Sequence, residues 1–133
     1  MGFVSFEEHQ SKKNEPLKKE EIKISKNRFK GDLNVFSGAS GEFIVSIIPS
    51  MDVSGYGKSE NEAIEDLKYN LNIFLEDLFK LSVSQRSIYL KDLGWDIDTF
   101  FKKKYSTIFI DNNGILQNFD KPEEVKISSL QFA

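Results

Sequence analysis

The sequence of 133 residues contains no cysteine and only one histidine, His9. Without cysteine the chain cannot form a disulfide, a thiolate metal site or a cysteine nucleophile. One histidine in a charged N-terminal stretch supports neither a multi-histidine zinc site nor a serine–histidine–aspartate triad. We therefore expect no metal ion and no cofactor, and we interpret His9 as a solvated residue.

Long apolar runs and an excess of positive charge are missing as well. No apolar run approaches the ~20 residues that a membrane-spanning helix needs. The 18 basic and 21 acidic residues give a net charge of −3, which disfavours a globally basic nucleic-acid-binding protein. The first residues do not have the layout of a signal peptide. We expect a cytoplasmic protein with no membrane contact.

What the sequence does contain is a strand-forming apolar mixture in a chain of single-domain length. There are 12 phenylalanines but only 3 alanines. Phenylalanine and isoleucine favour strands, whereas alanine-poor sequences rarely form helical bundles. These features predict a small α+β domain over residues 21–133, preceded by a charged and mobile tail over residues 1–20.

The pattern of apolar residues predicts a small antiparallel sheet of three or more strands packed by one long amphipathic helix. Alternation begins at Ile22, and residues 43–48 form the strongest strand signal before Pro49 removes a ladder donor. Apolar residues then recur at spacings of three and four for five turns after Ser59. A core over residues 21–80 follows from this pattern.

Residues 81–133 are expected to extend this core with a helical segment and a β-hairpin. A helix is predicted over about 84–93, with Ser84 as its N-cap, and a short helical turn over 96–104. Asn-Gly at 113–114 between two apolar runs predicts the hairpin. Much of the aromatic excess falls in this extension.

The segment between the short strand and the long helix holds four residues with structural roles. Gly55 and Gly57 are predicted to form the strand-to-helix turn. Ser59 and Glu62 have the spacing of a capping box, in which each side chain binds a backbone N–H of the other residue. Glu62 and Asp66, one helical turn apart, leave open a carboxylate-dependent hydrolase, although two-metal sites need acids from several elements.

Two basic groups are candidates for nucleic-acid contact. Basic side chains interleaved with aromatic ones can bind RNA phosphates and bases, although lysines on an edge strand also prevent unwanted strand pairing. The residues concerned are Lys23, Lys26, Arg28, Lys102, Lys103 and Lys104. An RNA-binding module is therefore an alternative function.

A family resemblance rests on three short motifs. They are the strand that ends in a proline at 43–49, the turn Gly57-Lys-Ser59, and the helix start Glu62-Ala63. With this spacing the segment from about Ile22 to Phe79 resembles the HicB-like antitoxin family. The resemblance implies a three-stranded antiparallel sheet with one packed helix, which is a partial ribonuclease-H fold.

The resemblance also implies how the protein works. HicB-like domains usually form dimers or higher oligomers and bind a small toxin ribonuclease. Their usual helix-turn-helix or ribbon-helix-helix is missing after Phe79, so we do not expect DNA binding. We expect a non-catalytic module that binds a protein or RNA partner, with a homodimer as the most natural assembly.

Overall fold

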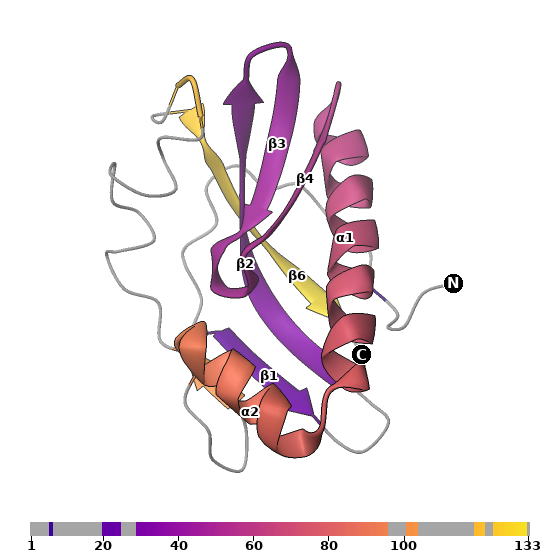
Figure 1. Ribbon diagram of the computed structural model, residues 1–133. Coiled ribbons are helices and arrows are strands. Elements are labelled where there is room, and N and C mark those ends of the chain that lie inside the picture. Colours follow the sequence, from indigo (N-terminus) through magenta and orange to yellow (C-terminus); the bar gives the residue numbers. More distant parts are fainter. Residues whose placement is uncertain are drawn as a thin grey trace.

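The computed structural model describes residues 6, 20–24, 29–95, 119–121 and 124–132, together with the backbone of 101–103. An antiparallel sheet packs against a long helix, and a second helix follows, which confirms the α+β fold (Figure 1). The elements are β1 (Glu20–Ile24), β2 (Phe29–Ser40), β3 (Phe43–Ile48), the 3-10 turn η1 (Pro49–Met51), β4 (Val53–Gly57), α1 (Glu60–Lys80), α2 (Val83–Asp92), β5 (Phe101–Lys103) and β6 (Lys126–Phe132).

Strand β2 organises the sheet because it is 12 residues long and pairs with three other strands. Asp32 pairs with both β1 and β6, and Phe36 pairs with both β3 and β6. A strand has only two sides, so β1 and β3 must lie one after the other on the same side of β2. Strand β4 continues beyond β3, and β5 continues beyond β1.

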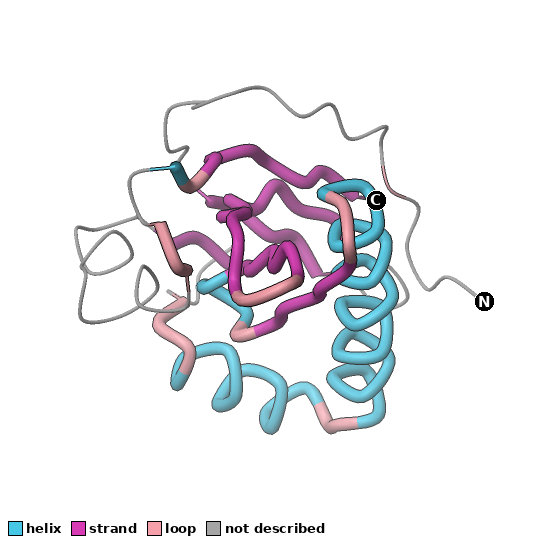
Figure 2. Tube along the Cα trace, turned by 90° about the horizontal axis from the view of Figure 1, so that it is seen from above, coloured by secondary structure: helices cyan, strands magenta, loops and turns pink. Residues whose placement is uncertain are grey.

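Helix α1 covers one face of the sheet with the predicted apolar stripe. Figure 2 shows α1 and α2 bordering the sheet on two adjacent sides. The residues of α1 that join the main core recur at spacings of three and four; they are Ile64, Leu67, Leu71, Leu75 and Leu78, and Ala63 is buried as well. Leu33 and Val35 from β2 and Ile48 from β3 complete the contact between the layers.

A smaller apolar cluster lies on the opposite face of the sheet. Phe36, Phe119 and Val125 are buried there, with Val45 and Ile47 packed against them. Apolar contacts on both faces, from Ile48 in the main core and from Val45 and Ile47 against the smaller cluster, explain why β3 is a nearly continuous apolar run rather than an alternating one. The contact also shows that the segment around Phe119 covers part of the outer face.

Two local predictions for the C-terminal part need correction. Helix α2 begins at Val83 with Ser82 as N-cap, because Ser82 and Gln85 form a complete capping box that Ser84 could not form. Residues 101–103 form a strand rather than part of a helical turn, since their backbone pairs with β1. Gly94 follows α2 with a φ of 99°, as expected of a helix-terminating glycine. The predicted hairpin at 112–114 lies outside the described residues.

Two residues of the N-terminal stretch are described, and both Phe6 and Glu20 pair with strands of the sheet. Phe6 forms an isolated antiparallel bridge with Phe132, and the two ring centroids are 6.0 Å apart. Lys68 of α1 lies 5.6 Å from the centroid of the Phe6 ring. Glu20, predicted as the last residue of the tail, is the first residue of β1 and is 2% exposed.

A buried polar cluster lies beside the middle of β2, in the gap between the stretch that pairs with β1 and the stretch that pairs with β3. The backbone N–H of Asn34 donates to Glu20 Oε2 at 2.9 Å, and the Ser50 hydroxyl donates to the same oxygen at 2.7 Å. The Trp95 indole N–H in turn donates to the Ser50 carbonyl at 3.1 Å. Glu20 thus provides an acceptor for Asn34 at the gap between two strands, which connects β2 to η1 and to the end of α2.

Within the described residues, neither helix combines the length and the apolar character required to span a membrane.

Candidate functional site

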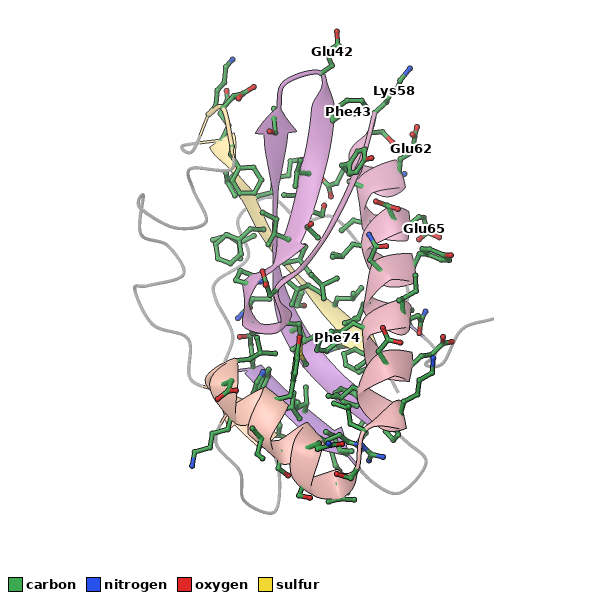
Figure 3. The ribbon with its side chains drawn as sticks, in the orientation of Figure 1. Glu42, Phe43, Lys58, Glu62, Glu65 and Phe74 are labelled. Atoms are coloured by element: carbon green, nitrogen blue, oxygen red, sulfur yellow. The ribbon has the colours of Figure 1, made fainter. Side chains whose placement is uncertain are left out.

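The first predicted group of residues extends from β4 through the following turn into the first turn of α1. Ser59 is the N-cap of α1, and its hydroxyl accepts the N–H of Glu62 at 3.2 Å. Glu62 Oε1 accepts the N–H of Lys58 at 3.4 Å rather than that of Ser59, so the reciprocal half of the predicted capping box is displaced by one residue. Figure 3 shows Lys58 and Glu62 side by side at this end of the molecule.

The two glycines of this segment allow β4 and α1 to approach closely. A Cβ atom on Gly55 would lie 2.2 Å from the backbone nitrogen of Leu67, and one on Gly57 would lie 2.4 Å from the Cβ of Glu62. No side chain fits at either position without moving the helix. Both glycines lie in β4 rather than in the predicted strand-to-helix turn, which Lys58 and Ser59 form, and their role is this close packing.

Polar side chains of α1 cover the open edge of β4. Asp66 Oδ2 accepts the N–H of Tyr56 at 3.0 Å, and the Asn70 amide donates to the carbonyl of Ser54 at 2.8 Å. With Glu62, these side chains recur every four residues along one side of the helix. They bind the backbone groups that a further strand would otherwise bind. The sequence signal was a polar stripe beside the apolar one, of which Glu62 was predicted as a capping residue and Glu62 with Asp66 as hydrolase candidates.

This use of the acids bears on the hydrolase alternative. Glu62 and Asp66 both bind backbone N–H groups of the adjacent turn and strand. Among the described residues, no group of three or more histidine, aspartate and glutamate side chains is placed to hold a metal ion. The two carboxylates have a structural role that requires no catalytic one.

Among the basic residues predicted to contact nucleic acid, Lys23 lies next to a further lysine in the sheet. Lys23 of β1 stands directly opposite Lys30 of β2, and both are exposed. Lys102 stands opposite Glu21 in the register between β5 and β1, and Lys103 stands opposite Glu20. The remaining predicted residues, Lys26, Arg28 and Lys104, lie outside the described part of the chain.

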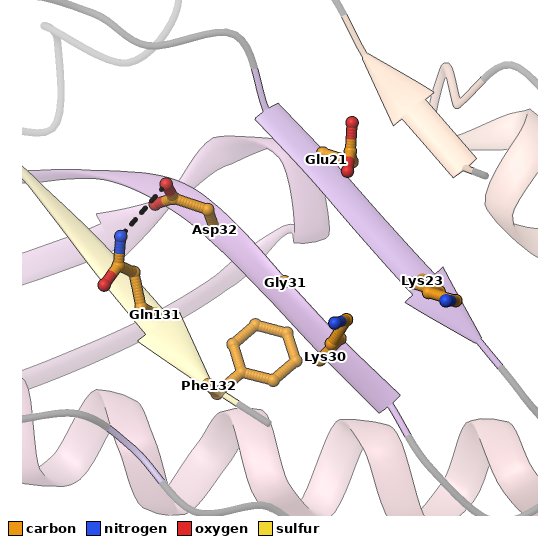
Figure 4. Close-up of a pocket in the computed structure, with 7 residues that line it drawn as sticks. All are labelled: Glu21, Lys23, Lys30, Gly31, Asp32, Gln131 and Phe132. Carbon is orange, nitrogen blue, oxygen red and sulfur yellow. Dashed lines mark hydrogen bonds between the residues drawn. The ribbon is translucent and has the colours of Figure 1, made fainter.

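Around these lysines the outer face of the sheet is hollowed into an open groove. Its volume is about 350 Å³, and it lies across β1, β2 and the end of β6 (Figure 4). We call it the charged groove; its polar lining residues are Glu21, Lys23, Lys30, Asp32 and Gln131, and Gly31 and Phe132 complete it. Sequence reasoning missed Asp32 and Gln131, because only the strand register places them next to β1 and its lysines.

One carboxylate of the charged groove is held in a fixed orientation. The Gln131 amide donates to Asp32 Oδ2 at 3.3 Å, as the dashed line in Figure 4 marks. Asp32 Oδ1 is shielded from solvent and has no hydrogen-bond partner among the described residues.

A second surface of functional interest lies on the two helices. Most of the large apolar side chains that are exposed in the described residues belong to α1 and α2; they are Tyr69, Ile73, Val83, Ile88 and Tyr89. We call this set the helical apolar surface. Tyr89 of α2 also contacts the half-buried Phe74 of α1, with ring centroids 5.7 Å apart. The exposed pair Phe43 and Tyr56 lies on the sheet.

Comparisons with known proteins find nothing similar to this chain, whether among family models, curated proteins or solved structures.

Proposed function

We propose that the protein is a non-catalytic, HicB-like binding module that acts by binding a small protein partner. A toxin ribonuclease is the partner class that the family resemblance implies. A cytoplasmic location and a homodimer belong to the same proposal. The observation that carries it is the helical apolar surface, five large apolar side chains that are exposed on α1 and α2, because aromatic side chains are enriched in protein interaction sites.

The arrangement of the core supports the proposal as well. Strands β2, β3 and β4 form an antiparallel meander followed directly by α1, which is the order that the resemblance implies. Asp66 and Glu62 of α1 bind backbone N–H groups of β4 and of the turn after it, which gives both carboxylates a role in a non-catalytic protein. The net charge of −3 also suits a basic partner, since opposite net charges accelerate association.

Affinity capture with the full-length chain in its native host tests this function. We expect the chain to retain a small basic protein whose ribonuclease activity falls when the purified chain is added. Ile88→Lys should abolish retention, because it places a charge in the helical apolar surface. Tyr56→Lys is the matched control: Tyr56 is 61% exposed and Ile88 is 62% exposed, but Tyr56 lies on the sheet.

Two results would contradict the proposal. One is retention that is unaffected by Ile88→Lys, which would place the interaction elsewhere. The other is a captured protein whose ribonuclease activity is unchanged by this chain, which would remove the antitoxin-like role.

RNA binding is the second candidate, and the register of β1 supports it. Lys23 lies opposite Lys30, and the backbone of the Lys102–Lys103 segment borders the same strand. If RNA binds here, its affinity for the chain must fall as salt rises, because phosphate contacts release counterions. Measurement with a single-stranded oligonucleotide at two salt concentrations tests this, and affinity independent of salt would exclude phosphate contact.

A further inference from the structure

Helix α1 concentrates the net negative charge of the protein. It contains six acidic residues and two lysines, which give it a net charge of −4, whereas the whole chain has −3. Helix α2, with one arginine, one lysine and one aspartate, has a net charge of +1. The two helices that form the helical apolar surface therefore differ in sign, and a charged partner would distinguish them.

The side of α1 turned away from the sheet places two apolar side chains between acidic ones. Tyr69 and Ile73 are 65% and 42% exposed, and each follows a buried leucine by two residues, which is about 200° round the helix. Every fourth residue on this side belongs to one ridge, which we call the α1 ridge; its members are Glu65, Tyr69, Ile73 and Asp77. The ridge has a carboxylate at each end and apolar side chains in the middle.

The contacts within the protein leave the carboxylates of the α1 ridge accessible to a further cation. Glu65 pairs with Lys68 at 3.1 Å, and Asp77 pairs with Lys80 at 3.6 Å. Both lysines belong to α1 and are included in its net charge, and both carboxylates are exposed, so these ion pairs contribute little to stability. Glu76, next to Asp77, has no ion-pair partner within the described residues.

The other three acids of α1 serve the fold instead. Glu60 pairs with Lys126 of β6 at 3.1 Å. Glu62 and Asp66 accept the backbone N–H groups of Lys58 and Tyr56. The acids that α1 offers to a partner are therefore those of the ridge, together with Glu76.

We propose that the α1 ridge docks a basic amphipathic helix of the partner protein, an inference that rests on the proposed function. Apolar side chains of the partner pack on Tyr69 and Ile73, and lysine or arginine side chains at its two ends meet Glu65 and Asp77. From Glu65 to Asp77 the ridge rises about 18 Å, so a partner helix of similar length covers it. The backbone groups within a helix are paired already, which leaves the packing of side-chain ridges into grooves as the mode of contact.

The charge of α1 favours this occupant over the alternatives. A second copy of α1 would bring the same net charge of −4, and a nucleic acid would bring phosphates, so both would be repelled. Helix α2, with its net charge of +1, offers a basic helix no attraction. Charge complementarity therefore assigns the basic helix to α1.

Fluorescence anisotropy with the full-length chain and a labelled synthetic peptide tests the inference. The peptide is an amphipathic helix of about four turns, with two leucines one turn apart in its centre and lysines at both ends. A matched peptide has glutamates in place of the lysines. We expect only the lysine peptide to bind, and its binding should weaken as salt rises. Equal binding of the two peptides, or no binding of the lysine peptide, would overturn the inference.

Two pairs of substitutions locate the site. Glu65→Lys with Asp77→Lys should weaken peptide binding about tenfold or more. Glu42→Lys with Glu124→Lys is the matched control, because it changes the net charge equally at two exposed acids outside α1 and α2, and it should change the affinity by less than about twofold. If the first pair does not fold, Glu65→Gln with Asp77→Asn should still weaken binding. Unchanged binding by this neutral pair, or equal weakening by the control, would refute the site.

Capture of the native partner separates this inference from the proposed function. If Ile88→Lys abolishes retention but Glu65→Lys with Asp77→Lys does not, the proposed function stands and the α1 ridge is refuted as the docking site. If the lysine peptide binds the ridge but the chain retains no protein from its host, the proposed function fails while the site stands. Self-association of the chain that Tyr69→Lys abolishes would assign the ridge to a second copy and overturn the inference.

Discussion

Replacing Glu20 by alanine should remove much of the stability of the fold. Glu20 is 2% exposed, and its Oε2 accepts the N–H of Asn34 and the hydroxyl of Ser50. The variant leaves these two buried donors without this acceptor, at about 1–3 kcal/mol each, so we expect a loss of about 2–6 kcal/mol. That loss is large beside the 5–15 kcal/mol that typically separates folded from unfolded domains.

Chemical denaturation of the purified chain, followed by circular dichroism, measures this loss. Glu21→Ala is the matched control, since Glu21 is the next residue of β1 and its side chain is exposed on the other face. Its effect should stay within about 0.5 kcal/mol, as is usual for surface positions. A Glu20→Gln variant retains an acceptor oxygen and should fall between the two.

A double-mutant cycle with Ser50→Ala isolates the contact between Glu20 and Ser50. We expect a coupling energy of about 1–3 kcal/mol, because the two side chains bind each other directly. Equal losses for Glu20→Ala and Glu21→Ala, or a coupling energy near zero, would refute the role assigned to the buried carboxylate.

Three further predictions concern α1 and α2. Gly55→Ala should cost about 3 kcal/mol or more in thermal unfolding, because its Cβ would collide with the backbone of α1 at 2.2 Å. Asp66→Ala should cost about 0.5–1.5 kcal/mol and cause concentration-dependent association in light scattering, since it exposes the Tyr56 N–H on the edge of β4. Ser82→Ala should cost about 1 kcal/mol of stability in denaturant titration, whereas Ser84→Ala should cost less than about 0.5 kcal/mol.

Each of these predictions has a result that contradicts it. Wild-type stability of Gly55→Ala would show that the layers are not in close contact at β4. A strictly monomeric Asp66→Ala at high concentration would mean that the helix does not protect the strand edge. Equal effects of the two serine variants would contradict the position of the N-cap.

Local patterns were sufficient wherever one short segment decides its own conformation. The strand over 43–48 ends at Pro49 because proline has no N–H to donate, whatever the rest of the chain does. The spacing of the apolar residues after Ser59 similarly determines which side of α1 is buried. The N-cap of α2 was misplaced because two serines lie two residues apart and only the capping bonds distinguish them.

The roles of the polar residues could not be predicted in this way. Asp66 was predicted as a candidate catalytic acid. Its structural partner, the Tyr56 N–H, lies on a strand that only the tertiary structure places beside α1. Asp32 was not identified because its place opposite Glu21 depends on the strand register, which also brings Lys30 opposite Lys23. Gln131 is 99 residues from Asp32 along the chain, so no local pattern relates them.

The sequence by itself determined the α+β class, the principal strand and the long helix with its buried stripe, because these follow from periodicity and from the backbone chemistry of proline and the capping serine. Only the tertiary structure decided that Glu20 is buried, that the acids of α1 cover β4, and that the charged groove forms on the outer face. The reason is strand register, which decides which side chains stand opposite each other and which face of the sheet they occupy. A shift of one residue would move each side chain to the other face, and long-range contacts fix the register.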